Sequence, residues 1–129
     1  MKAFIWLFAI LVIACTGKQS NYQKADDALD AGREYINACL QGDFSKASFY
    51  TVSNEKSIEI LKNMEKIYRE NDKEGRQQLR TASINIIEIK ELTDSSTIIF
   101  YSNSFDKIPT SITISKQNKN WFVDLSKNN

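Results

Sequence analysis

Histidine is missing from this 129-residue sequence. It is the commonest general base in enzymes and the commonest metal ligand, so its absence removes the simplest route to acid–base catalysis or a metal centre. The four glycines form no glycine-rich loop that could cradle a phosphate. The two cysteines are not spaced as metal ligands, and no calcium-loop spacing occurs. We therefore expect no metal, no cofactor and no catalytic residue.

An excess of charge of one sign is also absent, since Lys plus Arg number 17 and Asp plus Glu 16. Such a balance provides no field that would attract nucleic acid, so we expect no nucleic-acid partner. Hydrophobic residues make up 42% of the chain and charged residues 26%, which is ordinary globular usage. A chain of this length predicts one domain that buries its own core without a disulfide.

The amino terminus has the pattern of a targeting segment. Lys2 precedes an apolar run over residues 4–14 that is too short to span a bilayer comfortably and suits a signal peptide. The run ends in Val-Ile-Ala before Cys15, which resembles the lipobox of bacterial lipoproteins, although Leu is commoner than the Val. The resemblance implies cleavage after residues 1–14, acyl chains on Cys15 and a polar tether over residues 15–22. The alternative is a plain secretory signal with an incidental cysteine.

If Cys15 is acylated, two or more chains anchor the protein stably in a membrane. We expect a cell-envelope protein that faces the periplasm, with exposure at the cell surface left open. The other cysteine, Cys39, then has no disulfide partner and is expected to be a small core residue.

A clear helical stripe over residues 23–41 is the strongest structural signal in the sequence. Glycine at position 42 is typical of a left-handed helix stop, and Gly32 within the stripe predicts close packing against another element. The apolar residues of the stripe, at helical spacing, are Ala25, Ala28, Leu29, Gly32, Tyr35, Ile36, Cys39 and Leu40.

Two more helices are predicted before residue 78. Asp43 can cap a short helix over residues 44–50, and Ser53 or Asn54 can begin a longer one. The sign of charge alternates over residues 69–76, which we interpret as a solvated helix end with Gly75 as its stop. The apolar face of the longer helix comprises Ile60, Leu61, Met64, Ile67 and Tyr68, with Ile58 off that face.

The apolar period then changes to two, which indicates strands at residues 82–92, 97–103, 110–116 and 121–125. The phase switches between Ile86 and Ile87, so the first strand should contain a bulge. We predict an α+β fold in which three helices lie against one face of a curved, four-stranded antiparallel meander. The single domain should cover residues 23–126, with a tail at 127–129.

Two local patterns resemble a known family. The first helix runs into Gly42-Asp43-Phe44, followed by a Lys-Ala helix, and the last hairpin ends in Trp-Phe-Val-Asp at residues 121–124. These features are similar to nuclear-transport-factor-like (cystatin-like) domains of unknown function in small bacterial lipoproteins. The resemblance implies a cone with a cavity between the helices and the sheet.

Four aromatic side chains are candidates for a ligand pocket, namely Tyr35, Tyr68, Tyr101 and Trp121, although they can equally fill the core. Our first hypothesis is an anchored protein that binds a small apolar ligand or an envelope protein without catalysis. An enzyme of the cone-fold isomerase or dehydratase type is the alternative, and it needs a pocket carboxylate. The best carboxylate is Asp124, for which a solvated or turn-bonded role is the simpler interpretation. A spacer or assembly protein is a third option.

Overall fold

A computed structural model describes residues 22–128 of the chain. The signal peptide, Cys15 and most of the predicted tether lie outside the described residues. Within them, no helix is long and apolar enough to cross a membrane. The elements are, in order, α1 (Ala28–Gln41), α2 (Phe44–Phe49), α3 (Glu55–Glu70), α4 (Lys73–Thr81), β1 (Ile84–Thr93), β2 (Ser96–Asn103), β3 (Thr110–Gln117), β4 (Asn120–Val123) and the 3-10 turn η1 (Leu125–Lys127).

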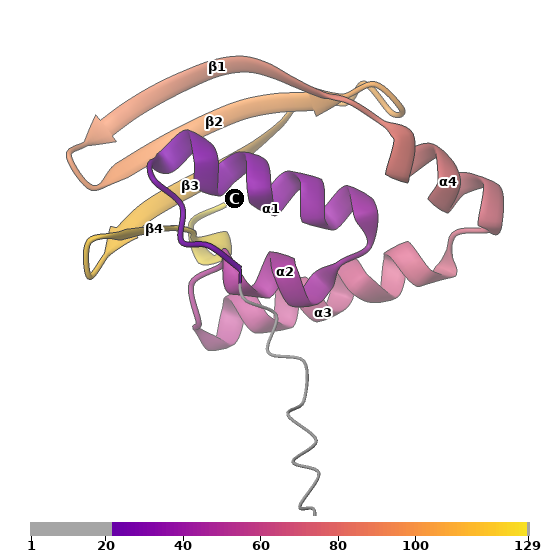
Figure 1. The fold of residues 1–129 in the computed structure, drawn as a ribbon, viewed down its shortest axis with the longest axis horizontal. Coiled ribbons are helices and arrows are strands. Elements are labelled where there is room, and N and C mark those ends of the chain that lie inside the picture. The colour runs from indigo at the N-terminus through magenta and orange to yellow at the C-terminus, as the bar shows by residue number, and fades with distance from the viewer. Residues whose placement is uncertain (1–21, 129) are drawn as a thin grey trace, which may run out of the picture.

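The four strands form one antiparallel meander in the order β1-β2-β3-β4. The sheet is curved, and the helices lie on one side of it (Figure 1). Helix α1 contacts all four strands and also α2 and α4, while α3 contacts α2 and η1. The predicted α+β architecture is therefore confirmed, with α1 as the element that joins the sheet to the other helices.

The core is centred where α1 crosses the sheet. Ile99 and Ile114 are completely buried, and a Cβ at Gly32 would lie 2.6 Å from the Cδ1 of Ile99. Because real Cβ atoms do not approach carbon this closely, any larger residue at position 32 would force the Ile99 side chain or the helix to shift. The close packing predicted at Gly32 is confirmed.

The predicted bulge lies in β1. Ile86 pairs with Tyr101 and Glu88 pairs with Phe100, so Ile87 has no partner in β2. The extra residue moves the following side chains to the other face and bends the strand. Strand β2 lies between β1 and β3, as its two apolar faces indicated.

The first helix is shorter than the prediction of residues 23–41. It begins at Ala28 because the Asp27 side chain accepts a hydrogen bond from Asp30 N at 2.8 Å, which caps the helix. Its end is as predicted: Gly42 has φ 72°, and Asp43 N donates to Ala38 O at 2.9 Å. The helical spacing of apolar residues continues upstream of this cap at Ala25, and for that reason the predicted start of the helix lay too early.

The interpretation of residues 69–76 as a helix end stopped by Gly75 is wrong. Helix α3 ends at Glu70, and a separate helix, α4, begins at Lys73. Asp72 caps it by accepting a hydrogen bond from Gly75 N at 2.7 Å. Gly75 thus lies inside the first turn of α4, and the described chain has four α-helices where three were expected.

The predicted tail at residues 127–129 is wrong for residues 127 and 128, which are part of the domain. Lys127 belongs to η1, and Asn128 Oδ1 accepts a hydrogen bond from Thr113 N at 2.9 Å. The predicted β3–β4 turn is present, with φ of 49° at Asn118 and 68° at Lys119. Two successive positive φ values are those of a type I′ hairpin, which suits the twist of the strands.

Candidate functional site

A hollow of about 310 Å³ opens between α3, α4 and β2, with α1 at its base. We call it the tyrosine hollow. Ten of its thirteen lining residues are apolar or aromatic, as expected of a site for an apolar ligand. These ten are Tyr35, Ile36, Cys39, Leu40, Phe44, Met64, Ile67, Tyr68, Leu79 and Tyr101, and the polar remainder is Asn71, Asn103 and Asp106.

Three of the four aromatic residues predicted from the sequence meet in this hollow. Tyr35 comes from α1, Tyr68 from α3 and Tyr101 from β2. Trp121 does not join them, because it lines a separate hollow with Leu29 of α1. The aromatic group that could contact one ligand is therefore the three tyrosines.

The base of the tyrosine hollow is uncharged at neutral pH. Tyr35 is 2% exposed, and its hydroxyl donates to the Met64 sulfur at 3.6 Å. Burial raises the pKa of the Cys39 thiol to about 12, and the neighbouring Tyr35 hydroxyl, which lowers it, offsets only part of this effect. Burial likewise raises the pKa of Tyr35 and of Tyr101 above their usual range. Two hydroxyls and a thiol thus provide polarity there without charge.

The loop between β2 and β3 forms one side of the mouth. Asn103 Oδ1 accepts hydrogen bonds from Phe105 N at 2.9 Å and Asp106 N at 3.0 Å, and Asp106 Oδ1 accepts one from Ile108 N at 2.9 Å. These bonds hold the loop in a defined conformation in which Lys107 has φ 57°. Phe105 and Ile108 remain 44% and 61% exposed. The loop thus contributes Asn103 and Asp106 to the lining of the hollow and carries exposed apolar side chains beside them.

Sequence reasoning missed part of this lining. Leu79 lies on the helix that was not predicted, and Asn103 and Asp106 lie at or after the end of β2. Ile67 was assigned to the buried face of α3 but is 55% exposed, because it stands at the rim of the hollow. The cap at Asp72 was the available signal for α4, whereas no sequence pattern marked the loop.

A second hollow of about 460 Å³ lies beside the first. We call it the β3 hollow, because the beginning of β3 and the residue before it supply much of its wall. Its lining residues are Tyr35, Ile60, Met64, Tyr101, Pro109, Thr110, Ser111, Ile112, Leu125 and Asn128, and none of them carries a charge. The two hollows thus share Tyr35, Met64 and Tyr101.

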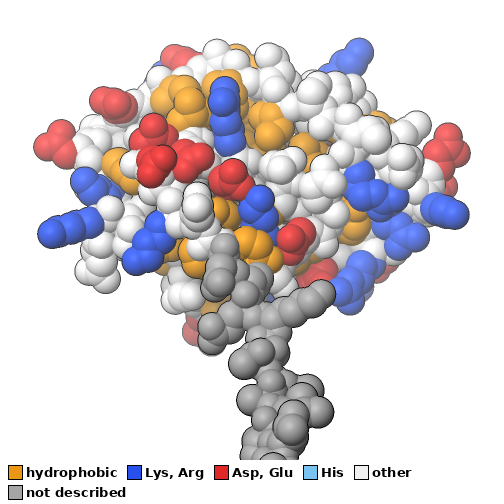
Figure 2. Space-filling model, in the orientation of Figure 1, with side chains coloured by type: hydrophobic (Ala, Val, Ile, Leu, Met, Phe, Trp, Pro, Cys, Tyr) orange, Lys and Arg blue, Asp and Glu red, His pale blue; other side chains and the backbone are white. Residues whose placement is uncertain are grey.

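A larger hollow of about 580 Å³ lies between α2 and α3. Its wall includes Asp43, Ser45 and Ser48 of the α2 segment and a charged ion pair, Arg69 with Glu65, from α3. Figure 2 shows acidic and basic side chains interspersed on one face of the molecule, with small hydrophobic areas between them. Phe44, Ile58 and Leu61 also line this groove, so its wall is mixed and less apolar than that of the tyrosine hollow.

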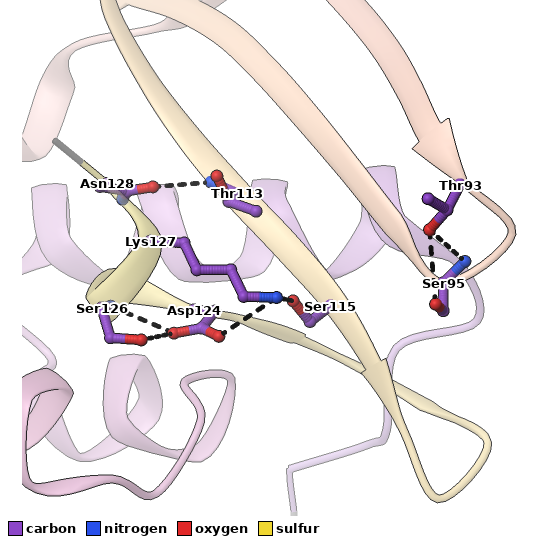
Figure 3. A network of polar contacts seen from close by, with 8 residues as sticks. All are labelled: Thr93, Ser95, Thr113, Ser115, Asp124, Ser126, Lys127 and Asn128. Carbon is purple, nitrogen blue, oxygen red and sulfur yellow. Dashed lines mark hydrogen bonds and ion pairs between the residues drawn. The ribbon is translucent and has the colours of Figure 1, made fainter.

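The best carboxylate candidate, Asp124, is 5% exposed and bonded within the carboxyl-terminal turn. It accepts a hydrogen bond from Ser126 N at 3.1 Å and from the Ser126 hydroxyl, and Lys127 Nζ lies 3.9 Å from it (Figure 3). It lines neither the tyrosine hollow nor the β3 hollow. The turn-bonded interpretation is confirmed, since Asp124 caps η1. Among residues 22–128, no three His, Cys, Asp or Glu side chains are grouped as a metal site.

No protein-family model matches the sequence. Comparison with curated proteins finds no match either. The fold is similar to the crystal structure of an NTF-2 like protein of unknown function from Shewanella oneidensis MR-1, with a TM-score of 0.57 and 16% sequence identity. The similarity covers 76% of this chain and 92% of the other. It confirms the predicted nuclear-transport-factor-like fold, and at this identity it shows the fold alone.

Proposed function

We propose that this protein is a lipid-anchored component of the bacterial cell envelope that binds a small apolar ligand without catalysis. The observation that carries the binding proposal is the tyrosine hollow, with ten apolar or aromatic side chains among its thirteen lining residues. Aromatic rings around an uncharged base can hold an apolar molecule, while three polar residues at the mouth remain hydrated. No described carboxylate lies at the base, so binding is favoured over acid catalysis.

The lipobox supports the anchoring proposal. A tether of seven residues after Cys15 reaches at most about 25 Å, so an acylated Cys15 would keep the domain near the membrane. The described end of this segment is tied to α2, because the rings of Tyr22 and Phe49 are 5.5 Å apart. In addition, the Tyr50 hydroxyl donates to Gln23 O at 2.6 Å. These contacts hold residues 22 and 23 against the α2 segment, so an anchor on Cys15 would lie near α2 in the chain.

Anchoring is tested by expressing the full chain and its Cys15→Ala variant in cells fed radiolabelled palmitate. We expect label and membrane association in the parent protein and the loss of both the label and signal cleavage in the variant. The matched control is Cys39→Ala, which removes the other cysteine and should leave labelling unchanged. Equal labelling of the parent and Cys15→Ala would refute the anchor.

Ligand binding is tested by mass spectrometry of organic extracts from the purified protein. Leu79→Trp places a large ring in the tyrosine hollow, and Ser45→Trp places the same ring in the groove between α2 and α3. We expect a bound apolar compound in the parent and in Ser45→Trp, and its loss from Leu79→Trp. Extracts that do not differ among the three proteins would refute the site.

The enzyme alternative needs an acid inside the site. The carboxylate that lines the tyrosine hollow, Asp106, is exposed and accepts a backbone hydrogen bond in the loop. Because its side chain is open to solvent, Asp106 is not an acid enclosed within the site. The three tyrosines instead converge on a space for an apolar molecule, which favours a ligand over a protein partner as the occupant.

A further inference from the structure

The tyrosine hollow and the β3 hollow lie end to end along α3. The tyrosine hollow adjoins the carboxyl-terminal half of the helix at Ile67 and Tyr68, whereas the β3 hollow adjoins its earlier half at Ile60. Met64 lies between these positions in the sequence and lines both spaces. Tyr35 and Tyr101 also line both spaces, so the two hollows meet at these three side chains, which we call the partition.

Met64 is the movable part of this partition. Its side chain is unbranched and flexible, and it is held by a single weak hydrogen bond from the Tyr35 hydroxyl to its sulfur, at 3.6 Å. Met64 is also half-buried, so its end can turn without displacing the core. A change of rotamer at this one residue would open a passage between the two hollows.

The two spaces differ in chemistry. The tyrosine hollow is walled mainly by aliphatic and aromatic side chains, while the β3 hollow offers the hydroxyls of Thr110 and Ser111 and the amide of Asn128. The Oδ1 of Asn128 accepts a bond from Thr113 N, and its amide N–H groups are donors that a ligand could use. No charged side chain lines the β3 hollow.

We propose that the ligand is a single-chain amphiphile with an uncharged polar head, which lies in the β3 hollow while its aliphatic chain passes Met64 into the tyrosine hollow. This inference rests on the proposed function and specifies its ligand class. A carboxylate head would find no cationic partner among the lining side chains, whereas hydroxyl and amide groups can bond an uncharged head. A compact ring would occupy one hollow and leave the other unused.

The experiment uses the full chain in its own membranes and two photoreactive monoacylglycerols. One carries a diazirine next to the head group, and the other carries it at the end of the acyl chain. After irradiation, mass spectrometry of peptides locates the attachment sites. We expect the head-group probe to label Ile112 or Leu125 in the β3 hollow, and the chain-end probe to label Ile36 or Leu79 in the tyrosine hollow.

A variant of the partition provides a second measurement. Met64→Phe puts a rigid ring at the junction, and we expect labelling of the tyrosine hollow by the chain-end probe to fall about tenfold, equivalent to about 1.4 kcal/mol. The matched control is Ile58→Phe, because Ile58 lies on the same helix, is 44% exposed and lines neither hollow. Its labelling should equal that of the parent. Should Met64→Phe not fold, the two attachment sites in the parent still test the inference.

Three outcomes would separately contradict the extended ligand, its uncharged head group and the proposed binding function. If both probes label the tyrosine hollow alone, the extended ligand is refuted while an apolar site remains. If a fatty-acid probe labels as well as the monoacylglycerol, the uncharged head is refuted. If neither hollow is labelled above the Leu79→Trp background, the proposed binding function fails as well.

Discussion

Substitution of Gly32 by alanine tests how closely α1 approaches the sheet. In an unconstrained helix this change stabilises the fold by about 1 kcal/mol, because glycine is the poorer helix former. Here the new Cβ would lie 2.6 Å from Ile99 Cδ1 and 3.3 Å from Ile114 Cδ1. Both isoleucines are completely buried, so their methyl groups could move away only by rearranging within the core.

Overpacking of this kind costs about 1–3 kcal/mol. With the helix-propensity gain subtracted, Gly32→Ala should lower the free energy of unfolding by about 1 kcal/mol. Chemical denaturation of the parent and the variant measures this difference. The matched control is Gly75→Ala in α4, where the closest contact is an exposed aspartate side chain and not the core. We expect that variant to be at least as stable as the parent.

A double-mutant cycle with Ile99→Val isolates the contact. Valine lacks Cδ1 and by itself costs about 0.5–1.5 kcal/mol. If the new Cβ clashes with Ile99 Cδ1, Ile99→Val should destabilise the Gly32→Ala protein less than it destabilises the parent. The coupling energy between the two substitutions should be about 1 kcal/mol. Additive effects, or a Gly32→Ala protein more stable than the parent by the full helix-propensity gain, would refute this account of the interface.

Three further predictions concern the helix stop at Gly42, the half-buried thiol of Cys39 and the carboxyl-terminal turn. Gly42→Ala should lower the free energy of unfolding by about 2 kcal/mol, because φ is 72° and the new methyl group would meet the Tyr68 ring. An unchanged midpoint of denaturant unfolding would contradict this. Burial raises the pKa of Cys39 from near 9 to about 12. The neutral thiol therefore contributes fully to the free energy of unfolding below pH 9, and this contribution is lost as the pH rises towards 12. The free energy of unfolding should therefore fall over that range, by up to about 1.4 kcal/mol per pH unit from this group, and less steeply in Cys39→Ala. Asp124→Ala leaves Ser126 N without its acceptor and should cost about 1–3 kcal/mol, seen as faster amide exchange at Ser126; unchanged exchange would count against the cap.

Much of the fold was predictable because local signals agreed with one another. The stripe of α1 and the stop at Gly42 were visible in the order of residues, as was the phase switch at Ile87. Each depends on neighbours in the chain: a helix period, a left-handed glycine, and a break in alternation. The additional helix α4 was missed because its apolar content is small and the cap at Asp72 lay inside a charged run.

The candidate site was predictable in part. Amphipathic rings could be identified as pocket residues by type, and three of the four chosen do lie together. The exception, Trp121, is separated from them because its position in β4 places it beside the start of α1, near Leu29. Which rings share a space depends on how α1 and α3 cross the sheet, and no local pattern contains that information.

The sequence alone was enough to predict the class of fold, a candidate lipidation residue in Cys15, and the positions of three helices and four strands, although it missed α4. These follow from interactions between residues close in the chain, where the spacing of apolar side chains sets the period. Tertiary structure decided that Tyr35, Met64 and Tyr101 form a partition between two hollows and that Asp124 serves a turn. Such contacts join segments far apart in sequence, so they exist only when the helices are packed against the curved sheet.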